Sequence, residues 1–554
     1  MKNKTISNKR SKAPYPILIF LVWLITYIVC QFILEQKFEW DEAKYLACAK
    51  GIVNNFDFSS RSTTVLGLFK YGFPHHTQHY PLHSLYVAIF FKLFGSSLTV
   101  AYFSTWVSAL ITCLFIYFTV LMLTDNNNKK FSFFVAISFL FFPRVIYYCN
   151  SVMMEIPGCA LLASSIFLIF RNILKNKLNP CLLGFLSIIL FFYKSLFIGV
   201  VVGLLVLVVL TSSPKLPGLK INNNPIQCLV LFLIIFLVPY YILKKFVFLP
   251  LAPWLNFTTQ QEGIAGTYAD FAGGFLNHPV EFAIANLKNF FDIFVNGYFP
   301  KWPFILADEV VDGYYLIHPS WLEFGVFLLV LLCVTIFLFL FWKKLLPSQR
   351  TFILFTVTSI WAFNLIIIVM AKITLGLFPR YNLIYFPLFL VSCSVLLWVS
   401  IDYLRQFGKV AICLFVGLIV IIYIPIFNTN LKITNWKKDF MYKREFNNST
   451  VIKKFIDASN PMFIYFDRGT YTTWDLFPVR EIFMEVSSEQ IRKLNLRLPK
   501  PIEYLFLKPD NYLFKENQEL ILRRQPIINN EYSFYGIDSE NSIVVYRYQK
   551  LHLL

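Results

Sequence analysis

The feature that most constrains this chain is a series of long apolar runs along its first three quarters. Runs of about 18 residues or more with few charges can cross the ~30 Å hydrocarbon layer of a bilayer as helices. Apolar runs of this kind lie at residues 16–34, 100–123, 131–148, 157–170, 182–210, 228–249, 322–342, 352–371, 383–400 and 410–427. They predict a polytopic α-helical membrane protein.

The run at 182–210 is too long for one span, and Tyr193 and Lys194 lie at its middle. A lysine at the centre of a bilayer is costly, whereas one at a turn on the membrane surface is not. The sequence therefore predicts two short helices that meet at Lys194, and a total of about 11 to 13 spans.

Lysine and arginine gather in alternate connections between the spans. The N-terminal tail alone holds Lys2, Lys4, Lys9, Arg10 and Lys12. Because cytoplasmic loops carry an excess of these residues, the N-terminus is predicted to be cytoplasmic and the C-terminus extracytoplasmic, in a plasma or inner membrane. The net charge of +19 is then mainly a topology signal. A nucleic-acid partner is not indicated, since no folded basic domain carries the charge.

The pattern divides the chain into a transmembrane domain at 1–427, with external loops at 35–81 and 250–319, and an external domain at 428–554. Apolar residues at helical spacing predict a helix over 43–52 on the membrane surface. The apolar stretch at 81–95 is short for a span and is predicted to be interfacial. In the external domain, strand-length apolar clusters at 462–466, 503–507 and 542–548 alternate with helical patterns at 449–457 and 487–494. This alternation predicts a small α/β domain.

Three acidic residues are candidates for chemistry at the outer membrane edge. Asp41 and Glu42 directly follow the first span, and Glu155 opens a later one. A carboxylate at this depth can act as a general base toward an acceptor hydroxyl or amine. The alternative is structural, since acids at the start of a helix complement its dipole.

Two cations, Lys194 and Arg380, are placed at the same depth, and Tyr381 lies beside the arginine. Such cations suit a lipid phosphate, which arginine can bind with a forked geometry. Snorkelling to ordinary head groups is the alternative. With Asp41 at the same level, the sequence favours a donor-phosphate site.

Four of the seven histidines fall between residues 75 and 83. His79 and His83 are spaced to share a helix face, and imidazole is a common metal ligand. Without a cysteine or an H-E-x-x-H pattern, the sequence favours a polar interfacial loop as the explanation of the cluster. The sequence therefore requires no cofactor and leaves a divalent metal ion open.

The order of these features resembles the polyprenyl-phosphate-sugar-dependent GT-C glycosyltransferases, which include protein O-mannosyltransferases and the lipid A aminoarabinose transferase. The motifs that carry the resemblance are W-D-E-A-x-Y (40–45), Y-P-L…F-F-K-L-F-G (80–95), S-x-x-x-E-I-P (151–157), F-Y-K-S (192–195) and P-R-Y…P (379–387). The resemblance implies a GT-C fold and a role in cell-envelope glycosylation.

The resemblance also implies roles for individual residues. Asp41 would activate the acceptor, with Glu42 and Glu155 as further acidic residues of the catalytic site. Tyr45 and Tyr80 would line the substrates, and the donor phosphate would contact Lys194, Arg380 and Tyr381. The sequence departs from the family pattern at His79 and Tyr80, where an acid and a lysine are usual, and at Tyr193-Lys194-Ser195, where T-K-G is usual. These departures leave the donor and any metal open.

The mechanism implied is a single displacement at the anomeric carbon, from a polyprenyl-phosphate sugar to an external glycan, lipid or protein. Two other functions remain as alternatives. A flippase for lipid-linked oligosaccharides would need charges inside the spans, facing a pathway. An O-antigen-type polymerase or ligase would share the substrate class but normally lacks the acidic pair after the first span.

Overall fold

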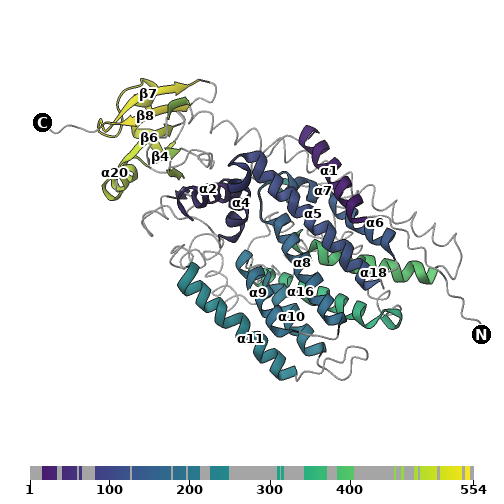
Figure 1. Ribbon diagram of the computed structural model, residues 1–554. Helices are drawn as coiled ribbons and strands as arrows, with labels where there is room; N and C mark the ends of the chain where they lie inside the picture. The colour runs from purple at the N-terminus through teal and green to yellow at the C-terminus, as the bar shows by residue number, and fades with distance from the viewer. Residues whose placement is uncertain are drawn as a thin grey trace, which may run out of the picture.

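The computed structural model describes residues 15–33, 40–58, 62–64, 81–124, 128–175, 179–194, 197–211, 225–248, 309–311, 314–316, 342–370, 383–404, 454–456, 463–466, 480–483, 487–498, 500–507, 512–539 and 543–549. A helical bundle forms most of the molecule, and a smaller sheet lies beside one end of it (Figure 1).

The helices of the bundle follow one another along the chain. They are α1 (Tyr15–Ile33), α2 (Trp40–Asn55), α4 (Leu82–Phe94), α5 (Leu98–Leu123), α6 (Lys129–Leu140), α7 (Pro143–Cys149), α8 (Glu155–Leu174), α9 (Pro180–Tyr193), α10 (Ile198–Thr211), α11 (Pro225–Ile242, extended by a π-helical segment Leu243–Phe248), α16 (Pro347–Met370) and α18 (Phe386–Leu404). Within the described residues, five helical segments are long and apolar enough to cross a membrane: Tyr15–Phe32, Leu98–Leu123, Glu155–Leu174, Ile226–Val247 and Leu383–Tyr403. The chain is a multi-pass membrane protein.

The structure confirms most of the predicted helices within the described residues and corrects one. The run at 182–210 does break at Lys194, between α9 and α10. The run at 131–148 was predicted as one span, and this is wrong, because α6 ends at Leu140 and α7 begins at Pro143. A proline has no N–H and disfavours helical backbone in the residue before it, so the break falls there. Residues 322–341 and 410–427 of two further predicted runs lie outside the described residues.

Helix α5 is central to the bundle, because polar contacts join it to helices at both of its ends. The indole Nε1 of Trp23 in α1 donates a hydrogen bond to the carbonyl oxygen of Trp106, at 2.7 Å. At the other end, the amide of Gln349 in α16 donates to the carbonyl oxygen of Leu123, at 2.8 Å. Such bonds satisfy buried polar groups in an otherwise apolar interior. They fix α1 and α16 against the same helix.

Helices α2 and α4 pack against each other and against the N-terminal end of α5. Leu46 and Ile52 of α2 share a buried cluster with Val87 and Phe91 of α4 and with Tyr102 of α5. With 13 residues, α4 is about 20 Å long, which is too short to cross the bilayer upright. The short helix predicted over 43–52 is confirmed, and the stretch after residue 81 is a helix too short for an upright span. The position of both helices at the membrane interface stays a prediction.

The C-terminal part forms a six-stranded mixed sheet with strand order β1-β5-β4-β6-β8-β7. The strands are β1 (Ser62–Thr64), β4 (Phe463–Phe466), β5 (Arg480–Phe483), β6 (Ile502–Leu507), β7 (Tyr532–Asp538) and β8 (Ile543–Tyr548), with helices α20 (Ser488–Arg497) and α21 (Gln518–Leu522). Strands β2 (Glu309–Val311) and β3 (Tyr314–Leu316) form a separate antiparallel pair. The predicted strands at 462–466, 503–507 and 542–548 and the helix at 487–494 are confirmed. Of the helix predicted at 449–457, only 454–456 are described.

The sheet contains one strand from far away in the sequence. Strand β1 comes from the loop between α2 and α4, and it pairs in parallel with β5 at the edge of the sheet, with Thr63 opposite Ile482. The sequence did not predict this strand, which has only three residues. The loop at 35–81 and the C-terminal sheet are therefore joined by backbone pairing.

Candidate functional site

Two of the predicted site residues form a buried ion pair. Glu155 is the first residue of α8, and Lys194 directly follows the last residue of α9. The Nζ of Lys194 lies 2.9 Å from Oε1 of Glu155, and the two side chains are 1% and 0% exposed. The sequence assigned these residues separately, one as an acid and one as a phosphate ligand. The structure brings them into direct contact.

The helix ends explain why this pair can form. The backbone N–H of Lys194 still bonds to the carbonyl oxygen of Leu190, and the backbone then turns extended and leaves the helix. The lysine thus projects from the end of α9 toward the first turn of α8. Burying an ammonium or a carboxylate alone costs several kcal/mol, and the attraction of the pair in a low dielectric offsets much of this cost. The pair therefore holds a cation in place between the two helix ends.

A histidine and a tyrosine lie directly beside this ion pair. The Nε2 of His83, in the first turn of α4, lies 2.8 Å from the carbonyl oxygen of Val152, and its Nδ1 lies 3.0 Å from Oη of Tyr193. Tyr193 Oη is also 3.1 Å from the carbonyl oxygen of Met154. A carbonyl oxygen only accepts, so Nε2 of His83 carries the hydrogen. These bonds join α4, the turn before α8 and the end of α9.

Helix α2 reaches the same cluster through an aromatic contact. The ring of Tyr45 meets that of His83 edge to face, with centroids 4.9 Å apart. Tyr45 is 5% exposed, and Glu42 is completely buried on the same helix. Asp41 lies in the first turn of α2, one helical turn before Tyr45 and hence on the same helix face. The position of the Asp41 side chain lies outside the described residues, as do His79, Tyr80, Arg380 and Tyr381.

Sequence reasoning missed the part that Tyr193 plays and gave His83 a different one. Tyr193 drew notice only as the neighbour of Lys194, and His83 only as a candidate metal ligand. The two residues are 110 positions apart, and no spacing rule joins them. The aromatic residue before the lysine in F-Y-K-S was the one local signal.

The described geometry gives a metal site little support at His83. Both ring nitrogens of His83 already face protein partners, whereas a metal needs one of them as a lone-pair donor. Among the described residues, no group of three or more His, Cys, Asp or Glu side chains is placed to hold a metal ion. The role of His79 in metal binding stays a prediction.

Comparison with known proteins shows which solved structures have a similar fold. No protein-family model and no curated protein matches the chain. The crystal structure of ArnT from Cupriavidus metallidurans bound to undecaprenyl phosphate is similar, with a TM-score of 0.51 and 10% identity over 96% of this chain and 97% of that chain. Its apo state gives a TM-score of 0.49 over the same shares, again at 10% identity.

A further similar structure is the oligosaccharyltransferase AglB from Archaeoglobus fulgidus, in complex with an inhibitory peptide and a dolichol-phosphate. Its TM-score is 0.43 at 10% identity, over 98% of this chain and 75% of that chain. ArnT and AglB both belong to the GT-C superfamily. At such low identity the likeness concerns the fold, and this chain has the GT-C fold that its sequence motifs predicted.

Proposed function

We propose that this protein is an integral-membrane glycosyltransferase that moves a sugar from a polyprenyl-phosphate donor to an external glycan, lipid or protein. The observation that carries the proposal is the buried pair of Lys194 and Glu155, which Tyr193 and His83 connect to Tyr45 on the helix that bears Asp41. Support also comes from the GT-C fold, since the similar ArnT structure contains undecaprenyl phosphate.

The proposed reaction needs one general base for the acceptor and several side chains that bind the donor phosphate. Asp41 takes the proton from the acceptor nucleophile, which attacks the anomeric carbon of the donor sugar. The bond from that carbon to the phosphate oxygen breaks, and polyprenyl phosphate leaves with the electron pair. Lys194, Arg380 and Tyr381 stabilise the charge on the departing phosphate. Glu155 holds Lys194 in position, and the incoming phosphate competes with it for the ammonium.

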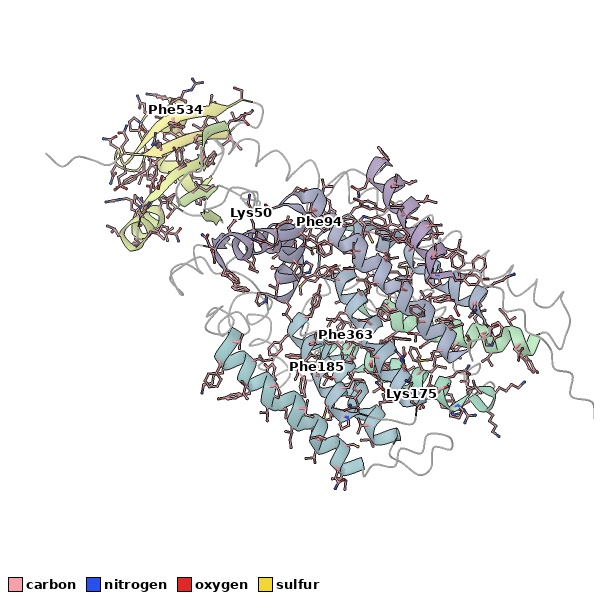
Figure 2. The ribbon with its side chains drawn as sticks, in the orientation of Figure 1. Lys50, Phe94, Lys175, Phe185, Phe363 and Phe534 are labelled. Atoms are coloured by element: carbon pink, nitrogen blue, oxygen red, sulfur yellow. The ribbon has the colours of Figure 1, made fainter. Side chains whose placement is uncertain are left out.

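The remaining predicted residues line the substrates. The proposal assigns this role to Tyr45 and Tyr80, and it keeps Glu42 as a further acidic residue on α2. The proposed topology puts this end of the bundle outside the cytoplasm. It is supported by the separation of two lysines in Figure 2, where Lys50 on α2 and Lys175 after α8 lie at opposite ends of the bundle. Lys175 belongs to a connection with a cytoplasmic charge pattern.

The test is transfer by the purified protein with a panel of polyprenyl-phosphate sugars, followed through release of free polyprenyl phosphate. The wild type should release it with at least one donor when an acceptor is present. Asp41→Asn should abolish release, because an amide cannot take the proton, while the variant still inserts and elutes as a folded protein. Near-normal release by Asp41→Asn would reject the catalytic role of this residue.

The same assay separates the alternatives. A flippase moves its lipid-linked oligosaccharide across the membrane without splitting the phosphate bond, so no free carrier would appear. A polymerase or ligase would release carrier only from an oligosaccharide donor, and not from a single sugar on polyprenyl phosphate.

A further inference from the structure

We infer that His83 and Tyr193 are positioning residues, which set helix α2 and its Asp41 against the Glu155–Lys194 pair. The inference rests on the proposed function, and it assigns a role in that reaction to two residues that need not touch the substrates. Four features of the structure carry it. His83 and Tyr193 each contact a backbone carbonyl shortly before Glu155. Tyr193 also directly precedes Lys194 in the chain, and the ring of His83 contacts that of Tyr45.

The first two features fix the start of α8. His83 donates to the carbonyl oxygen of Val152, and the single hydroxyl hydrogen of Tyr193 is within reach of both Nδ1 of His83 and the carbonyl oxygen of Met154, the residue directly before Glu155. The turn that precedes Glu155 is therefore contacted by side chains from two helices, α4 and α9. Because Tyr193 is also the residue directly before Lys194, its hydroxyl fixes the end of α9 against the start of α8. The ion pair then has a defined geometry on both sides.

The ring contact extends this geometry to α2. His83 touches Tyr45 edge to face and Tyr193 through its hydroxyl. Tyr45 lies one turn after Asp41 on the same face of α2. A single imidazole therefore stands between the helix that carries the proposed base and the helix ends that carry the proposed phosphate ligand.

Burial explains why these contacts would be rigid. His83 is 1% exposed, Tyr45 and Tyr193 are each 5% exposed, and Lys194 is 1% exposed. Buried polar groups that lose a partner are costly, so an alternative arrangement of this cluster is unfavourable. Misplacing a reacting group by about 1 Å can lower a rate by on the order of 100-fold. A cluster with this geometry can therefore control turnover from a distance.

The test uses three variants in the transfer assay. Tyr193→Phe removes the hydroxyl and keeps the ring. His83→Gln keeps a donor near the place of Nε2 and loses the contact to Tyr193, whereas His83→Asn keeps an amide near the place of Nδ1. We expect Tyr193→Phe and His83→Gln to lower kcat about tenfold with donor KM within about twofold, and His83→Asn to retain more of the activity.

A matched control separates positioning from stability. Tyr86 lies on the same helix as His83, and its partly buried hydroxyl bonds to the carbonyl oxygen of Ser104 and to Oγ of Ser108 on α5 rather than to the ion pair. Tyr86→Phe should cost similar stability and leave kcat unchanged. The double variant His83→Gln/Tyr193→Phe should lose less activity than the product of the two single losses, because the two substitutions share the contact between His83 and Tyr193.

A second measurement does not depend on activity. Cys48 on α2 is completely buried, and its thiol donates to the carbonyl oxygen of Phe58 at 3.1 Å. Loosening of α2 in His83→Gln should speed alkylation of Cys48 by N-ethylmaleimide, while the buried Cys228 on α11 keeps its rate. Wild-type kcat in all three variants, or equal losses in Tyr86→Phe, would overturn the inference. If no donor reacts with the wild type, the proposed function fails, and unchanged Cys48 alkylation would still refute the positioning of α2.

Discussion

At the scale of single residues, the site contains two buried charges, each of which would be costly to bury without the other. Lys194 and Glu155 are among the most deeply buried side chains of the described residues, and they lie 2.9 Å apart. In an apolar interior, removing one member of a buried pair typically costs about 3–5 kcal/mol, because the other charge remains desolvated. Replacing both members by apolar groups of similar size is often neutral. The pair is therefore better explained by function than by stability.

This difference yields a prediction. Lys194→Met alone should lower the stability of the protein by about 3–5 kcal/mol, whereas Glu155→Leu/Lys194→Met should restore most of the loss. The measurement is thermal unfolding in detergent. The double variant should nevertheless transfer no sugar, since it lacks the cation proposed to stabilise the leaving phosphate. A double variant with full transfer would show that the pair serves only the fold.

At the scale of elements, the close approach of α10 and α16 shapes the bundle behind the site. Gly199 and Gly203 lie one turn apart on α10 and face α16: a Cβ on Gly199 would lie 2.5 Å from the carbonyl oxygen of Ser359, and one on Gly203 would overlap the Ser359 hydroxyl. Small residues four positions apart let membrane helices approach closely. This contact fixes the position of the first turn of α10 against α16, just after the break at Lys194.

Enlarging this contact should be costly. Gly203→Ala adds a methyl group where Ser359 already lies, and overpacking of this kind costs about 1–3 kcal/mol. Its thermal midpoint in detergent should fall by several degrees. Gly158→Ala on α8 is the matched control, because its Cβ would lie at an ordinary 3.5 Å from Phe197, and it should change stability by less than about 0.5 kcal/mol. Equal midpoints for the two variants would contradict the close packing of α10.

At the scale of the whole molecule, the C-terminal sheet is tied to the helices of the site. Strand β1 belongs to the loop that joins α2, which carries Asp41, to α4, which carries His83. By pairing with β5 it adds an edge strand to the sheet. Figure 1 shows the sheet beside this end of the bundle. Movement of the C-terminal sheet would therefore act directly on the loop between the two site helices.

Breaking the strand should loosen the edge of the sheet and leave its centre intact. Thr63→Pro removes a backbone N–H and fixes the backbone away from an extended strand. Amide hydrogen exchange at 480–483 should become faster by on the order of tenfold. This is the change expected when one or two hydrogen bonds of about 1 kcal/mol each are lost. Exchange in β6 and β8 should stay slow, because these strands pair within the C-terminal segment. Unchanged exchange at 480–483 would show that β1 does not protect β5.

The sequence by itself determined what depends on neighbouring residues. Hydropathy predicted the described membrane helices, since the bilayer demands a long apolar run, and the charge of Lys194 predicted the break between α9 and α10. Strand-length apolar clusters predicted β4, β6 and β8 of the C-terminal part, but they did not predict β5 or β7. Pro143 was a local signal for the break between α6 and α7. The prediction missed this break because the apolar run continues through the proline.

Only the tertiary structure decided which distant residues meet. Glu155 and Lys194 are 39 positions apart, His83 and Tyr193 are 110 apart, and β1 pairs with a strand more than 400 residues later. These contacts depend on how helix ends are stacked, and neither helical nor strand periodicity encodes that stacking. A three-residue strand has too little pattern to stand out, and a buried ion pair is stable only after packing has excluded water from both partners.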